Sequence, residues 1–139
     1  DVYNIMKQVD CGIFPARAEG WNLELLEMMS CGKHVIATNY SAHTEFCNKD
    51  NCMLVEIDSL EKAEDGVFFS GKYGEWANIS ESSKDQIIEH MRNAHEIKQA
   101  FSGSIPNPKG VETAESFTWS NSIKELLNGL KLQDTEVHT

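Results

Sequence analysis

Two glutamates with seven residues between them, Glu19 and Glu27, are the first candidates for chemistry. Glu19 is followed by Gly20, and the pair stands between an apolar run and a segment rich in helix-forming residues. In open α/β sheets, ligands bind beyond the carboxyl ends of the strands. A helix N-terminus at that place offers unpaired N–H groups and partial positive charge to phosphate, and a glycine lets the backbone approach a ligand closely. The stretch 17–27 therefore predicts a cleft for a phosphate-containing ligand.

The second glutamate has two interpretations. Glu27 falls in an apolar part of the predicted helix, beside Leu25, Leu26, Met28 and Met29. A carboxylate in such surroundings needs partners, and sugar or ribose hydroxyls would serve. Alternatively, Glu24 and Glu27 form a solvated stripe, because residues three apart share a helix face. Spacing alone favours neither interpretation.

The elements that must position these side chains form one β-α-β unit over residues 9–38. Residues 9–14 are a compact apolar run closed by Pro15, which predicts a buried strand. Residues 21–31 predict a helix that stops at Gly32, and residues 35–38 predict a second strand. The loop between 16 and 20 carries Glu19. Strands that are apolar on both faces predict a parallel sheet covered by helices on both sides.

The remaining segments complete a small α/β protein. We expect a helix over 2–8, a polar turn over 39–42, a short helix over 44–47 and a third strand over 52–55. Residues 56–79 are expected to be mostly loop, with a little extended structure near 67–69. A helix over 83–101 begins with a capping box of Ser83 and Gln86. A break over 102–108, a helical patch over 109–115, a last helix over 120–130 and a polar tail follow.

The predicted fold is α/β: a partial Rossmann-like parallel sheet of about three strands flanked by helices. So small a sheet leaves an exposed edge and half-covered faces. The chain opens at Asp1 within a predicted helix, so we expect a fragment in which residues 1–132 form part of a domain truncated upstream and residues 133–139 form a tail. The exposed sheet edge or the last helix, with its stripe of Ile123, Leu126, Leu127 and Leu130, would support a homodimer.

Composition narrows the class of partner and the compartment. A formal net charge of -10 argues against nucleic acid and anionic membrane surfaces, because both repel an acidic protein. The four cysteines form no C-x-x-C pair, which is typical of a reduced, intracellular protein, and we expect Cys11 and Cys31 to be buried thiols. The histidines form no metal-binding pattern. Without a signal peptide or an apolar run of membrane-spanning length, we expect a cytoplasmic protein.

Two stretches resemble the signature of a known family. Residues 14–23 (FPARAEGWNL) and 29–38 (MSCGKHVIAT) resemble group 1 glycosyltransferases, whose pattern reads roughly F-P-S-x-x-E-G and later L-E-A-M-A-C-G-x-P-V-I-A. Glu19 and Glu27 match its two glutamates. Residues 41–45 (SAHTE) stand where the family has a Gly-Gly-x-x-Glu-like turn, and residues 117–119 (FTW) look like its F-S-W element. The likeness is strong over 9–47 and thinner up to about 130.

The resemblance implies a GT-B fold, a nucleoside-diphosphate sugar as donor, retention of the anomeric configuration and no metal or other cofactor. By motif position, Glu19 would be the catalytic residue that contacts donor-sugar hydroxyls near the reacting carbon. The backbone N–H groups of Gly20, Trp21, Asn22 and Leu23 would hold the donor, and Glu27 would bind its ribose hydroxyls. The family's basic pair and its acceptor domain lie upstream of Asp1. The resemblance thus implies a missing N-terminal GT-B domain, an acceptor of unknown identity, and a chain that is inactive alone.

Other interpretations stay open. The chain could be a stand-alone nucleotide-binding or interaction module of doubly wound fold, without transferase activity, or a sugar-nucleotide epimerase of related architecture. Glu24 replaces the family's proline, and Ser41-Ala42 replaces its small glycine turn. Arg17 either reaches the diphosphate or belongs only to the loop, and we expect the loop. Trp76 either shields a nucleotide base or packs in the core. His43 either contacts a ligand in the cleft turn or lies at the surface, and we expect the surface.

Overall fold

The computed structural model describes residues 1–101 and 106–136 and contains a parallel three-stranded sheet. Its strands are β1 (Cys11–Phe14), β2 (His34–Thr38) and β3 (Met53–Val55), in the order β1-β2-β3. Ile36 lies opposite Ile13 on one side and Met53 on the other, so β2 is the central strand. The predicted α/β class and the β-α-β unit are confirmed.

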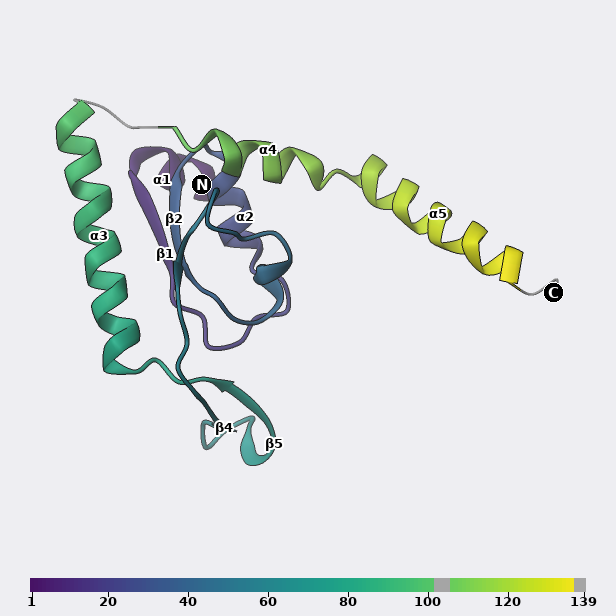
Figure 1. Ribbon diagram of the computed structural model, residues 1–139, viewed down its shortest axis with the longest axis horizontal. Helices are drawn as coiled ribbons and strands as arrows, with labels where there is room; N and C mark the ends of the chain where they lie inside the picture. Colours follow the sequence, from purple (N-terminus) through teal and green to yellow (C-terminus); the bar gives the residue numbers. More distant parts are fainter. Residues whose placement is uncertain (102–105, 137–139) are drawn as a thin grey trace.

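Helices cover both faces of this sheet (Figure 1). Helix α2 (Leu23–Ser30) packs on one face together with α4 (Pro108–Ser116), while α3 (Glu81–Phe101) packs against β2 and β3 on the other. Helix α1 (Val2–Gln8) has the predicted bounds and buries no side chain. The three layers place the loop between β1 and α2 at the carboxyl edge of the sheet.

The core lies between α2, the sheet and the segment after β2. Helix α2 buries Leu25, Met28 and Met29, whose spacing places them on one face. They form one cluster with five further buried residues, which are Val35, Ala37, Phe46, Cys47 and Cys52. All four cysteines are free. Cys11 and Cys31 are only half-buried, contrary to expectation, whereas Cys47 and Cys52 are buried. Burial, and to a lesser degree the Asp10 carboxylate, raises the pKa of the Cys11 thiol to about 11.

The segment expected to be mostly loop forms an antiparallel hairpin instead. Strands β4 (Leu60–Glu64) and β5 (Ser70–Ala77) pair with a register shift, and residues 67–69, expected to be extended, form the turn. The sequence did not indicate these strands because neither alternates apolar and polar residues. Ala63 is the one buried residue of β4, and Ala77 is the one buried residue of β5. The hairpin projects from the carboxyl edge of the sheet (Figure 1).

Asp65 organises the hairpin turn. One oxygen, Oδ1, accepts hydrogen bonds from the backbone N–H groups of Val67, Phe68 and Phe69, at 2.8, 2.8 and 2.9 Å. These bonds, that from Phe69 first, lower the pKa of the Asp65 carboxyl below its ordinary value. A carboxylate bonded to three N–H groups thus holds the turn, together with the edge-on contact between Phe69 and Trp76.

The turn is therefore expected to weaken in acid. Because the pKa of Asp65 is lower in the folded turn than in the unfolded chain, its contribution to stability is present above the unfolded value of about 3.9 and is lost as pH falls through the folded value. An NMR titration following the Asp65 carboxyl and the Phe69 amide measures this. Asp65→Asn keeps an oxygen acceptor without the charge and should remove the dependence. An ordinary aspartate titration of Asp65 would contradict the prediction.

Helix α3 begins two residues earlier than expected and is capped differently. Ser80 Oγ accepts from the Ser83 N–H at 3.2 Å, so Ser80 takes the capping role. Ser83 is fully buried and its hydroxyl donates to Glu56 O at 3.1 Å. The Gln86 side chain accepts from the Glu56 N–H at 2.9 Å. The predicted capping box is therefore wrong, because both of its side chains bind the segment after β3.

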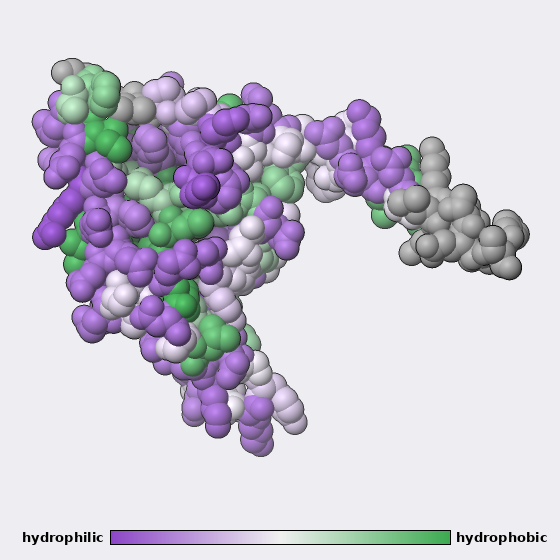
Figure 2. All heavy atoms as spheres, in the orientation of Figure 1, coloured by the Kyte–Doolittle hydropathy of each residue, from purple (hydrophilic) through white to green (hydrophobic). Residues whose placement is uncertain are grey.

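The C-terminal helices differ in how they pack. Helix α4 begins at Pro108, within the predicted break of 102–108, whose residues 102–105 lie outside the described part of the chain. Helix α5 (Trp119–Glu136) stands apart from the body and runs beyond the predicted end at 130 (Figures 1 and 2). Its apolar stripe of Ile123, Leu126, Leu127 and Leu130 is half or more exposed. Within residues 1–101 and 106–136, no helix is both long and apolar enough to cross a membrane.

Candidate functional site

The Glu19 loop lies where the sequence predicted it, between the carboxyl end of β1 and the start of α2. A pocket opens there. Its lining comprises Ile13, Phe14, Pro15, Ala16, Glu19, Asn22 and Glu24. Two carboxylates line this pocket, and its lining includes neither lysine nor arginine. Glu24, which in the sequence was only a departure from the family pattern, is thus part of the candidate site.

Asn22 shapes the start of α2. Its backbone is left-handed, with a φ of 68°, and its buried side chain caps the helix by accepting from the Leu25 N–H at 3.4 Å. Asparagine tolerates this conformation better than most residues because its short side chain bonds locally. The first N–H groups of a helix have no partner inside it. Since Asn22 engages that of Leu25, those of Leu23 and Glu24 remain available to a ligand.

The backbone of Glu19 is held by the loop that follows β2. Ser41 Oγ accepts from the Glu19 N–H and donates to the Glu19 carbonyl, each at 2.7 Å. The Glu19 side chain is exposed, and no hydrogen bond or ion pair engages its carboxylate within the described residues. The structure thus fixes the main chain of Glu19 while its carboxylate stays free to meet a ligand.

Ser41 adopts an unusual backbone conformation. Its φ is 75° and its ψ is -166°, a region that is essentially restricted to glycine. Such a conformation costs a non-glycine residue about 1–3 kcal/mol and persists only where surrounding contacts enforce it. The Thr44 hydroxyl and N–H both donate to the Ser41 carbonyl, at 2.7 and 3.1 Å. Sequence reasoning marked residues 41–45 as a turn but gave Ser41 no role.

His43 is buried, which corrects the expectation of a surface histidine. Its side chain is 0% exposed, and Nε2 lies 2.6 Å from the Thr38 carbonyl. Because a carbonyl only accepts, Nε2 carries the proton, and Nδ1 has no hydrogen-bond partner among the described residues. The Thr38 hydroxyl in turn donates to Ala16 O at 2.6 Å. His43 therefore ties the short helix η1 (Ala42–Glu45) to the end of β2 and, through Thr38, to the site loop.

Arg17 joins the site loop to the hairpin. Its Nε donates to Ala77 O at 3.0 Å, and the Ala77 N–H donates to Arg17 O at 2.8 Å. The guanidinium lies 4.2 Å from the Trp76 ring centroid and pairs with Glu61. Trp76 also meets Phe69 edge-on, with ring centroids 5.7 Å apart. Arg17 is thus engaged by the hairpin, in line with its expected place in the loop.

The other predicted donor residues are dispersed around this pocket. Trp21 is not among its lining residues, and its ring lies 5.2 Å from that of Phe46 and 5.3 Å from that of Phe117. Glu27 lies one helical turn beyond Glu24, exposed and outside the pocket lining. Gly20 has open space around it, and the Leu23 side chain is exposed. The structure therefore brings Glu19 and Asn22 together but leaves Glu27 on the outer face of α2.

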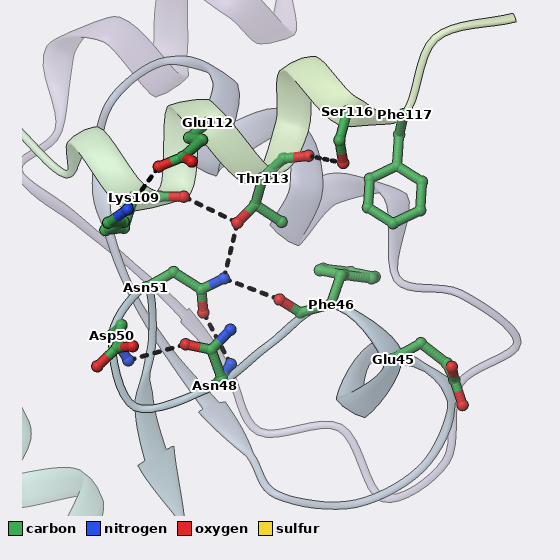
Figure 3. Close-up of a pocket in the computed structure, with 10 residues that line it drawn as sticks. All are labelled: Glu45, Phe46, Asn48, Asp50, Asn51, Lys109, Glu112, Thr113, Ser116 and Phe117. Carbon is green, nitrogen blue, oxygen red and sulfur yellow. Dashed lines mark hydrogen bonds and ion pairs between the residues drawn. The ribbon is translucent and has the colours of Figure 1, made fainter. Parts of the chain in front are cut away.

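A second cavity lies on the far side of η1, between it and α4 (Figure 3). Asn51 is buried at its base and donates to Phe46 O at 2.8 Å and to Thr113 Oγ1 at 2.9 Å. Lys109 pairs with Glu112 on its rim, as Figure 3 shows. The polar groups of Asn51 and Thr113 thus bond to each other, and this hydrogen bond connects α4 to the core at the cavity. Among residues 1–101 and 106–136, no group of three His, Cys, Asp or Glu side chains could hold a metal ion.

The fold is that of an α/β protein with a candidate ligand loop at the carboxyl edge of a parallel sheet. Residues 1–68 match the family described as Glycosyl transferases group 1. This match supports the predicted resemblance of residues 9–47 to a C-terminal part of a group 1 glycosyltransferase. The matched region contains the site loop, α2 and the Ser41 turn, and it ends in the turn of the hairpin. No curated protein and no solved structure matches the chain.

Proposed function

We propose that this chain supplies the donor half-site of a retaining glycosyltransferase that uses a nucleoside-diphosphate sugar and no metal. The observation that carries the proposal is the free Glu19 carboxylate, which lies in a pocket beside the N-terminus of α2 at the carboxyl edge of the sheet. Parallel sheets bind nucleotides at this edge. The family match over residues 1–68 supports transfer of a glycosyl group as the reaction type.

In this proposal each part of the loop has a separate role. The Glu19 carboxylate accepts hydrogen bonds from donor-sugar hydroxyls near the reacting carbon. The backbone N–H groups from Gly20 to Leu23 hold the sugar and phosphate, and the α2 N-terminus stabilises charge on the leaving diphosphate. Glu27, exposed one turn along the helix, binds the ribose hydroxyls. The Trp21 ring packs toward Phe46, so Trp21 contributes its backbone only.

The charge of the pocket supports the view that this chain is inactive alone. Glu19 and Glu24 line the pocket without a lysine or arginine beside them, and Arg17 is paired with Glu61. Two carboxylates oppose a diphosphate, because like charges close together repel. Cationic groups outside this pocket must therefore balance the leaving group. We propose that a second Rossmann-like domain supplies these groups together with the acceptor site.

The proposal is tested by saturation-transfer NMR with UDP-, GDP- and ADP-glucose. We expect one nucleotide class to bind and Glu27→Ala to weaken that binding about tenfold, the loss expected for roughly 1.4 kcal/mol of hydrogen bonding by a charged group. Glu89→Ala is the matched control, because Glu89 is likewise an exposed helical glutamate but lies on α3, across the sheet. Equal weakening by both variants, or no binding by the unmodified chain, would contradict the donor half-site.

A further inference from the structure

We propose that Ser41 is a positioning residue that latches the Glu19 loop to the loop after β2. The expected effect on donor binding rests on the proposed function, whereas the contact between the two loops rests on the hydrogen bonds alone. One hydroxyl closes two hydrogen bonds, both of 2.7 Å, to the N–H and the carbonyl of a single residue that lies 22 positions away in sequence. We call this pair of hydrogen bonds the Ser41 latch.

The latch needs a group that both donates and accepts from one atom. A hydroxyl does this, whereas an amide divides the two roles between nitrogen and oxygen, and an ionised carboxylate only accepts. Binding both polar groups of the Glu19 backbone leaves that residue little freedom to rotate. The Glu19 side chain therefore starts from a fixed point at the pocket wall, with its carboxylate unengaged.

The backbone of Ser41 gives an independent argument. Its φ of 75° and ψ of -166° suit glycine, and glycine would adopt them without strain. A serine here is destabilising to the turn unless its hydroxyl contributes something that glycine cannot. Its hydroxyl makes two hydrogen bonds, both to Glu19. Backbone strain that is offset by contacts to another loop is typical of active sites and ligand-binding segments.

The surrounding contacts make the latch rigid. The Ser41 carbonyl is held by Thr44, and η1 is held to β2 through His43 and Thr38. Thr38 also binds Ala16 O at 2.6 Å, which fixes the beginning of the site loop. The Glu19 loop is thereby bonded to the β2 end at two points, Ala16 and Glu19. Movement of the turn would carry Glu19 with it.

Two substitutions separate positioning from a merely structural role. Ser41→Gly removes the hydroxyl and the strain together, whereas Ser41→Ala removes the hydroxyl and keeps the strain. We expect Ser41→Gly to keep the thermal midpoint of the unmodified chain or raise it, and Ser41→Ala to lower it. Both variants should nevertheless weaken donor-sugar binding about tenfold, which corresponds to roughly 1.4 kcal/mol. A role in stability alone would spare binding in Ser41→Gly.

The experiment measures, on the full chain, NMR amide exchange, thermal midpoints and the affinity for the glucose nucleotide that binds best. The Glu19 amide should exchange about tenfold faster with solvent in both variants, because its acceptor is lost. The Ala77 amide, bonded to Arg17 O, is the internal reference and should not change. Unchanged Glu19 exchange in Ser41→Gly overturns the latch, and unchanged affinity there overturns its role in positioning. If the unmodified chain binds no donor, the proposed function fails, while Glu19 exchange still decides the latch.

Discussion

Leu25→Ala is expected to lower the free energy of unfolding by about 2–5 kcal/mol, the range for a buried leucine cut to alanine. Leu25 is 0% exposed and lies at the centre of the core between α2 and the sheet. The cost has two parts, because burial of the removed carbons is lost and the cavity left behind closes only partly. Because this core contains few side chains, its neighbouring residues can fill little of the cavity by shifting.

The matched control is Leu23→Ala, on the same helix. Leu23 is 59% exposed, so its truncation should change stability by no more than about 0.5 kcal/mol. Urea denaturation of both variants measures the difference, provided that the slope with denaturant is unchanged. Similar losses for Leu23 and Leu25 would mean that α2 does not pack through the face described. The same helix presents Glu24 to the pocket, so loosening α2 should also disturb the candidate site.

The first forty residues were predictable because their local signals agree with their tertiary roles. Pro15 closes β1, and Gly32, with a φ of +70°, ends α2. The apolar runs of β1 and β2 are short and end at clear breaks, so both their apolar pattern and their length indicate strands. The location of Glu19 followed from these boundaries. Hydrogen bonds such as the Ser41 latch join loops 22 residues apart, and no local pattern encodes them.

The hairpin and His43 were missed for a different reason. Residues 60–77 are held by Asp65, by Arg17 and by glycines with positive φ, so the strands do not need the alternating burial by which strands are recognised. His43 follows a serine and an alanine in a polar turn, where a surface position is the usual expectation. Its burial depends on the Thr38 carbonyl, which becomes a partner only after β2 and η1 have packed.

The end of the chain shows where amphipathic patterns stop being informative. The stripe on α5 was visible in the sequence, yet the pattern states only that an apolar face exists and not what covers it. In the structure Leu126 is 63% exposed, and the helix stands away from the sheet. By contrast α4, which carries fewer large apolar side chains, packs firmly on α2. Two features attach α4 that α5 lacks among the described residues: the hydrogen bond from Asn51 to Thr113 and the polar junction at Asn107.

Asn107→Ala is therefore expected to lower the free energy of unfolding by about 2–4 kcal/mol, from a lost helix cap and unpaired buried carbonyls. The side chain caps α4 by accepting from the Gly110 N–H at 2.9 Å. Its amide also donates to Asn51 O at 2.8 Å and to Lys33 O at 3.2 Å. Asn107 is 5% exposed, so water cannot readily replace these bonds. Urea denaturation gives the loss, and Asn128→Ala, at an exposed position of α5, is the control.

Asn107→Asp separates the two contributions. A carboxylate still accepts from the Gly110 N–H but cannot donate to the two carbonyls, and it brings negative charge against them. If the donated bonds attach α4 to the body, Asn107→Asp should destabilise the protein at least as much as alanine does. If Asn107→Asp instead retains most of the stability, the cap dominates and the donated bonds do not attach α4. The close packing of this junction also requires glycine at position 110, because a Cβ there would lie 2.6 Å from the Asn107 amide nitrogen.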